Sequence, residues 1–156
     1  MGEQLHCLLR KTWVAATKEE LVRQKILYNL IHLLDFLPSC IAVEKELSKM
    51  PHLALENQHL PLRRADILCY GKDIHPEHSL YPLLLIECKA VKLNSKVINQ
   101  ACGYNHFLRA YFVCVANATE AKTGWYDPLQ KGYVFIAGLP KYQELKDVLG
   151  NRKLSI

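Results

Sequence analysis

The sequence has no apolar run that approaches the roughly 18 residues needed to cross a bilayer, so we expect no membrane partner. Its start, MGEQLHCLLRK, lacks the apolar core and the cleavage site of a secretory signal. Internal repeats, low-complexity runs and dividing linkers are also missing. For 156 residues, half of them hydrophobic, we expect a single domain over residues 1–156, with a core at about 17–136 and a closing helix at about 141–150.

Paired cysteine motifs are absent as well. None of the six cysteines lies in a CxxC pattern, and most lie inside apolar stretches, where a thiol behaves as a small hydrophobic side chain. We therefore expect reduced thiols and a cytoplasmic location. His75 and His78 have a zinc-like spacing, but no second pair of ligands accompanies them, which argues against a structural zinc site.

Acidic residues are in the minority: 20 Lys and Arg face 15 Asp and Glu, for a net charge of +5 and a pI near 8.9. This mild basic excess is compatible with a polyanionic partner, but it is common among proteins that have none. Charge alone therefore assigns no function.

Hydrophobic periodicity predicts an α/β fold. Apolar residues recur with helical spacing from Thr17 up to Pro38, and again in 96–109, where Asn94 or Ser95 can cap the helix. Strands are expected in the segments SCIAVEKEL, ADILCY, PLLLIECKA, AYFVCVAN and GYVFIAG. Gly103, inside the second helix, costs about 1 kcal/mol relative to alanine, so we expect it to allow close packing against the sheet.

The segment PLLLIECKA is apolar on both faces, which predicts a central strand, until it ends in Glu87 and Lys89. Side chains two apart in a strand share one face, roughly 7 Å from each other. Asp66 lies near the start of the preceding strand, and antiparallel pairing of the two strands would bring the carboxylates of Asp66 and Glu87 together, with Lys89 beside them. Carboxylate oxygens are the hard ligands that Mg²⁺ prefers.

Asp66, a gap of about twenty residues and Glu87-x-Lys89 resemble the PD-(D/E)XK phosphodiesterase superfamily, with Ala65 where that pattern has proline. More specifically, the chain is similar to the N-terminal nuclease domain of the type I restriction endonuclease R subunit over about Lys18 to Val115. The matching strings are EELVRQKILYNLI, VEKEL, RRADILCY, LLLIECKAV and NQACGYN.

The resemblance implies a restriction-endonuclease-like core, a mixed β-sheet flanked by helices in the order αβββαβ. It also implies a Mg²⁺-dependent nuclease, with Mn²⁺ as a substitute, that hydrolyses DNA. Asp66, Glu87 and the backbone carbonyl of Cys88 would bind one ion, and Glu20 would help to bind a second ion about 4 Å away. Lys89 would orient the attacking water or offset charge on the phosphorane.

Two further pairs of residues receive roles from the resemblance. Gln100 and Tyr104 reproduce the QxxxY signature, and their spacing puts them on one helix face, from which they would hold Lys89 or a phosphate oxygen in place. Arg63 and Arg64 would contact phosphate beside the metal.

Each of these residues also has a structural interpretation. Thr17 and Glu20 form a capping-box pattern, which weighs about equally with a catalytic role for Glu20, and Glu19 competes for that role. Asp66 can begin a strand, and Glu87 with Lys89 can form a surface ion pair worth at most about 1 kcal/mol. Gln100 can be an ordinary helix residue and Tyr104 a core aromatic, while Arg63 and Arg64 can be a solvated pair.

Two rival functions stay open. One is a nuclease-like module that binds nucleic acid or a protein partner without turnover, and the other is binding through the basic surface alone. The family domain normally precedes an ATP-driven motor, whereas this chain has neither a Walker GxxxxGK[ST] motif nor room for motor domains. A motor or helicase would therefore come from another chain, and a homodimer is compatible with cutting two strands.

Overall fold

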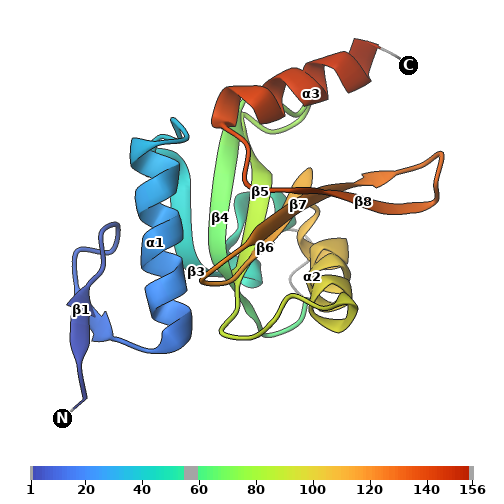
Figure 1. Ribbon diagram of the computed structural model, residues 1–156. Helices are drawn as coiled ribbons and strands as arrows, with labels where there is room; N and C mark the ends of the chain where they lie inside the picture. The colour runs from blue at the N-terminus through green and yellow to red at the C-terminus, as the bar shows by residue number, and fades with distance from the viewer. Residues whose placement is uncertain (1, 55–59, 155–156) are drawn as a thin grey trace.

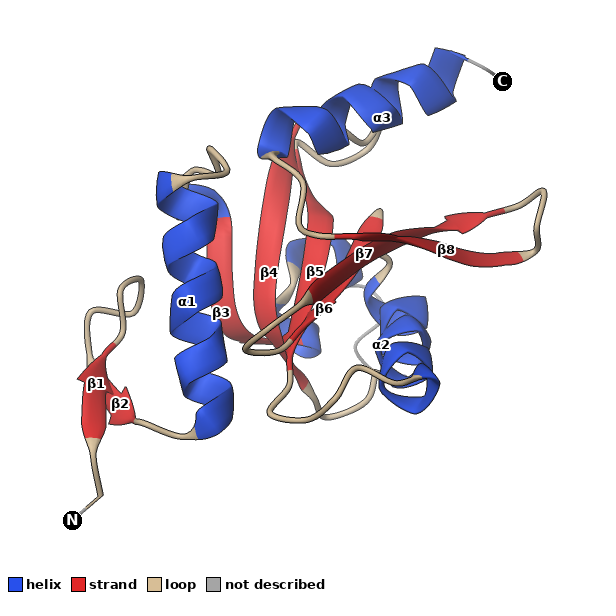
Figure 2. Ribbon diagram, in the orientation of Figure 1, coloured by secondary structure: helices blue, strands red, loops and turns tan. Residues whose placement is uncertain are grey.

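The computed structural model describes residues 2–54 and 60–154, whose main sheet is mixed and has helices on both faces (Figures 1 and 2). The strand order is β3-β4-β5-β6-β7-β8; β5 and β6 are parallel, and all the other neighbours are antiparallel. The strands are β3 Ile41–Glu46, β4 Arg64–Lys72, β5 Leu80–Cys88, β6 Phe112–Ala116, β7 Ala121–Asp127 and β8 Gly132–Ala137. This architecture confirms the expected α/β fold class.

Three helices flank the sheet: α1 Lys18–His32, α2 Ser95–Leu108 and α3 Tyr142–Leu154. Buried residues of α1 and α3 share one hydrophobic core with Ile67, Ile86 and Cys88 of the sheet. Buried residues of α2 pack in two other clusters, with Leu85 and with Val113. The layers are therefore α1 and α3 on one face and α2 on the other. None of the described helices is long and apolar enough to cross a membrane.

β5 occupies the middle of the sheet, between β4 and β6, as its apolar sequence predicted. Every residue from Tyr81 to Cys88 is buried, and Glu87 is the one acid among them. Burial on both faces explains why this strand reads as a continuous apolar run. A carboxyl group at such a position requires partners, because an isolated buried charge is strongly unfavourable.

The first helix is shorter than expected. Thr17 caps it, since its hydroxyl oxygen accepts the N–H of Glu20 at 3.1 Å, but the helix ends at His32 and not just before Pro38. Asp35 has a φ of 61°, which an α-helix cannot continue, and Leu33 is exposed. The apolar residues after His32 continue the helical spacing in the sequence, so the sequence predicted a longer helix than the one that forms. In the second helix, Asn94 and not Ser95 is the cap.

Two features were missed by the sequence analysis. A hairpin of β1 Gln4–His6 and β2 Trp13–Ala15 precedes α1, and β7 occupies residues 121–127, for which the sequence pattern predicts no element. β7 contains Gly124, and a glycine inside a segment argues against a strand when only the sequence is considered. In the fold, however, a Cβ at Gly124 would lie 2.6 Å from both the Phe135 ring and the Val134 carbonyl oxygen, so the close approach of β8 requires glycine there.

The expectation for Gly103 is wrong. A Cβ added at this position meets no atom within 4 Å, so the glycine does not serve close packing against the sheet. The sheet-facing residues of α2 are instead Val97, Ala101, Tyr104 and Leu108, all of them buried.

We expect Gly103→Ala to raise the free energy of unfolding by about 1 kcal/mol, because alanine has the higher helix propensity and the added methyl group meets no neighbour. Chemical denaturation of the two proteins measures the difference. Gly124→Ala is the matched control and should lower stability, since its methyl group would collide with β8. A destabilised Gly103→Ala would contradict the open surroundings of this position.

Candidate active site

The pairing of β4 with β5 brings Asp66 and Glu87 together. Ile67 lies opposite Ile86 in the antiparallel register, so the next pair of positions along the two strands is Asp66 and Glu87. The Oδ2 atom of Asp66 accepts the N–H of Cys88 at 2.8 Å. The structure therefore brings these two carboxyl groups together, as predicted, at the strand ends between α1 and α2.

The environment of Glu87 favours its neutral form. Its side chain is only 2% exposed, and burial, a hydrogen bond with Asp66 and the negative charge of Asp66 raise the pKa of Glu87 to about 9. The positive charges of Arg63 and Lys89 act in the opposite direction. The carboxyl pair therefore keeps a proton near neutral pH even with these cations beside it.

Arg63 joins this pair from the segment before β4. Its Nη2 atom donates to Glu87 Oε1 at 3.1 Å, and its guanidinium carbon lies 4.1 Å from the centroid of the Tyr104 ring. Tyr104 comes from α2 and is 3% exposed, yet its hydroxyl has no hydrogen-bond partner among the described residues. Burial and the nearby Glu87 raise the pKa of Tyr104. A buried hydroxyl without a partner beside two carboxyl groups is unusual and marks this position as a candidate functional group.

On the other side of Asp66 lies Arg23 of α1, a buried arginine that the sequence analysis did not select. Its Nη2 atom donates to Asp66 Oδ1 at 3.1 Å, and its Nη1 atom lies 3.0 Å from Glu20 Oε1 and 3.3 Å from Glu44 Oε1. One guanidinium thus links three acids. The sequence signal was the spacing of Glu20 and Arg23, which puts both on one face of α1.

Glu44 and Arg10 were also missed. Glu44 has a φ of 52° in β3 and lies between Val43 and Lys45, which pair with Ile67 and Ala65, so it is opposite Asp66. Arg10, in the loop between β1 and β2, forms ion pairs with Glu20 and Glu44. The unusual backbone of Glu44 is not visible in the sequence, and Arg10 lies outside the strings that suggested a family.

For Glu20, the structure separates the alternatives. Thr17 accepts the Glu20 N–H, but its own N–H donates to the Ala15 carbonyl at 2.9 Å, so the reciprocal half of a capping box is not formed. The Glu20 carboxylate points instead to the arginines and reaches Asp66 through Arg23. Glu19 is exposed. A catalytic role for Glu20 stays a prediction.

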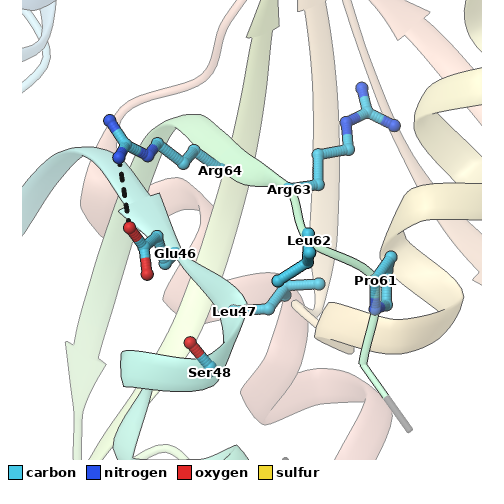
Figure 3. A pocket seen from close by; sticks show the side chains of 7 residues that line it. All are labelled: Glu46, Leu47, Ser48, Pro61, Leu62, Arg63 and Arg64. Carbon is cyan, nitrogen blue, oxygen red and sulfur yellow. Dashed lines mark hydrogen bonds and ion pairs between the residues drawn. The ribbon is translucent and has the colours of Figure 1, made fainter.

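Of the other predicted residues, some act on the carboxyl pair of Asp66 and Glu87 and others do not. Lys89 directly follows β5, is half-buried and donates its N–H to the Ala116 carbonyl at 2.8 Å; its charge acts on Glu87. Gln100 is exposed on α2, and no described residue hydrogen-bonds to its side chain. Arg64 turns away to Glu46 at 3.1 Å, as Figure 3 shows. The structure therefore groups Lys89, Arg63 and Tyr104 with the carboxyl pair and leaves out Gln100 and Arg64.

The carboxylates of Asp66 and Glu87 could bind a hard divalent cation as a two-carboxylate site. Mg²⁺ commonly binds one or two carboxylates and keeps several waters, which Asp66 and Glu87 can satisfy. Among the described residues, no three His, Cys, Asp or Glu side chains form a group that could hold a metal ion. The fit is therefore to a site of two carboxylates, Asp66 and Glu87, with Glu20 outside the direct set.

Comparison with protein families gave a match between residues 18–140 and the model described as the type I restriction enzyme R protein N terminus. This segment begins with α1 and ends before α3, so it contains the whole six-stranded sheet and every residue predicted for the site. Comparisons with curated proteins and with solved structures gave no match.

The carboxyl pair predicts a pH dependence of stability in the metal-free protein. Between the ordinary value of 4.5 and about 9, folded Glu87 keeps a proton that the unfolded chain has released. Its contribution to stability is therefore complete below pH 4.5 and is lost as the pH rises toward 9. We expect the free energy of unfolding of Glu87→Gln, which cannot ionise, to fall less over this range than that of the wild type.

Urea denaturation in EDTA at several pH values measures both slopes. Glu46→Gln is the control, because Glu46 forms an exposed ion pair with Arg64 and lies outside the carboxyl pair. Identical slopes for wild type and Glu87→Gln would show that Glu87 is ionised throughout.

Proposed function

The chain belongs to the family of the type I restriction enzyme R protein N terminus, and on this premise we propose that it is a Mg²⁺-dependent nuclease that hydrolyses DNA phosphodiester bonds. The observation that carries the proposal is the contact of Asp66 with Glu87 at the strand ends, with Lys89 acting on the same pair. A nuclease of this type needs carboxylates that hold a cation next to a group that handles the attacking water. Mn²⁺ is expected to substitute for Mg²⁺.

The chain's own residues divide the work as follows. Asp66 and Glu87 bind the ion, which supplies a Lewis acid for the phosphoryl oxygens and lowers the pKa of bound water. Asp66 is held in place at both oxygens, by the Cys88 N–H and by Arg23, so its orientation is fixed before a cation binds. Lys89 orients the attacking water and offsets negative charge on the phosphorane. No covalent intermediate with the protein is required.

A second candidate function is a nuclease-like module that binds nucleic acid or a protein without turnover. One observation favours it: each carboxyl group of the pair already has an arginine partner, Arg23 on Asp66 and Arg63 on Glu87. Guanidinium groups can neutralise these acids without any metal ion. Whether a divalent cation displaces them distinguishes the two functions.

We expect Glu87→Gln and Lys89→Ala each to abolish metal-dependent cleavage while the fold survives, because the first removes a metal-binding charge and the second the water-orienting ammonium. Cleavage of plasmid, linear duplex and single-stranded DNA in Mg²⁺ or Mn²⁺ is the measurement. Lys131→Ala, at the exposed turn between β7 and β8, is the matched lysine control and should retain full activity. Wild-type protein that leaves all three substrates intact with both metals would refute the nuclease proposal.

Binding of Mn²⁺ gives a test that is independent of cleavage. We expect Arg63→Ala to bind Mn²⁺ more tightly than the wild type, on the order of tenfold, because the guanidinium no longer competes for Glu87. Titration calorimetry measures the affinity. Arg64→Ala is a close control, since the neighbouring Arg64 pairs with Glu46 instead, and it should not change the affinity. An absence of Mn²⁺ binding in all three proteins would favour the module without turnover.

A further inference from the structure

A pocket of about 490 Å³ opens beside the candidate active site. Its walls come from two segments, residues 46–48 at the end of β3 and residues 61–64 at the start of β4 (Figure 3). The volume lies in the range of small-ligand sites. The pocket contains neither Asp66 nor Glu87, so it is a separate cavity next to the carboxyl pair.

The two arginines of the pocket connect it to different surroundings. Figure 3 shows Arg63 and Arg64 leaving neighbouring positions in opposite directions. Arg64 is held by Glu46 at the pocket rim, whereas Arg63 reaches Glu87. Arg63 therefore lines the pocket and contacts the candidate active site at once. An anion that binds Arg63 from the pocket side would lie next to the carboxyl pair.

The remaining wall is apolar and unusually accessible. Leu62 is fully exposed, although it adjoins Pro61 and the buried Leu47. A leucine this exposed leaves apolar surface in water, which favours contact with an apolar face of a ligand. The pocket thus combines an apolar wall with guanidinium groups that carry positive charge, and it has a hydroxyl group in Ser48.

We propose that this pocket binds one unpaired nucleotide of a nucleic acid strand, next to the phosphodiester bond that is cut. The base would lie against Leu62 and Pro61, and its phosphate would bind Arg63. This inference rests on the proposed function, because it names the substrate class of the same site: strands with unpaired bases in preference to intact duplex.

The preference for unpaired bases follows from the cost of extracting a base from a duplex. A stacked and paired base must leave its neighbours before it can enter a pocket, whereas a base in a single strand already has an exposed face. Apolar side chains such as leucine contact unstacked bases in nucleic acid complexes. An acidic peptide would satisfy the arginines, but its charged side chains offer no apolar surface to Leu62.

The test is equilibrium binding of labelled DNA in EDTA, by fluorescence anisotropy, so that no cleavage occurs. We expect wild-type protein to bind a single strand about tenfold more tightly than a blunt duplex of the same sequence. Leu62→Asp should lower the single-strand affinity about tenfold and the duplex affinity by a smaller factor, because its added charge repels the phosphates of both DNAs whereas only the single strand loses the contact with its base. A strand that lacks its bases should bind wild-type protein as weakly as the normal strand binds Leu62→Asp.

Leu129→Asp is the matched control, because Leu129 is also a leucine on the surface, 94% exposed in the turn between β7 and β8. It should bind both DNAs like the wild type. Both leucines are exposed, so the variants keep the core intact, and circular dichroism checks this. Equal single-strand affinities of wild type and Leu62→Asp, or an equal loss on duplex, would overturn the proposal, as would wild-type protein that binds no DNA.

These outcomes are separable from those of the nuclease proposal. Cleavage that persists while Leu62→Asp has no selective effect overturns the pocket alone. A selective effect of Leu62→Asp in a protein that cleaves nothing supports the pocket and refutes the nuclease.

Discussion

The contact between two carboxyl groups at the ends of β4 and β5 is the constraint to which the rest of the site responds. The strand register places Asp66 opposite Glu87, and burial of Glu87 removes water as a source of stabilisation. Such a contact is unfavourable when both groups are ionised. The fold compensates by directing positive charge at the pair from several elements.

Those cations come from parts of the chain that are distant in sequence. Arg23 approaches Asp66 from α1, Arg63 approaches Glu87 from the segment before β4, and Lys89 follows β5. Arg10 reaches Glu20 and Glu44 from the N-terminal hairpin, so the hairpin is tied to the same network. The electrostatic requirement of one pair of acids thus helps to fix how the first helix and the hairpin lie against the sheet.

The sequence predicted what depends on local pattern. The apolar run of β5 predicted a central strand. Its charged end singled out Glu87 and Lys89, because charges at the end of a strand that is buried on both faces need partners. Tertiary contacts decided the rest. The position of Glu44 in the site depends on its backbone conformation, and that of Arg10 on how the N-terminal hairpin folds back. The need for glycine at 124 depends on the close approach of β8. Hydrophobic periodicity reports none of these contacts. The prediction for Gly103 was wrong for the opposite reason, since the helix makes no close contact at that position.

The charges of the network also bear on how it could work. Four acids, Glu20, Glu44, Asp66 and Glu87, face four cations, Arg10, Arg23, Arg63 and Lys89, and Glu87 keeps a proton near neutral pH, so binding of a divalent cation is favoured when that proton or one of the guanidinium groups leaves. Among the three arginines, the Arg63 side chain is the most exposed at 40%, against 23% for Arg10 and 8% for Arg23. Arg63 can therefore move with the least loss of packing. Its other surroundings are the pocket beside β4, where a phosphate would replace Glu87 as its partner, so entry of a cation and binding of a strand would favour each other.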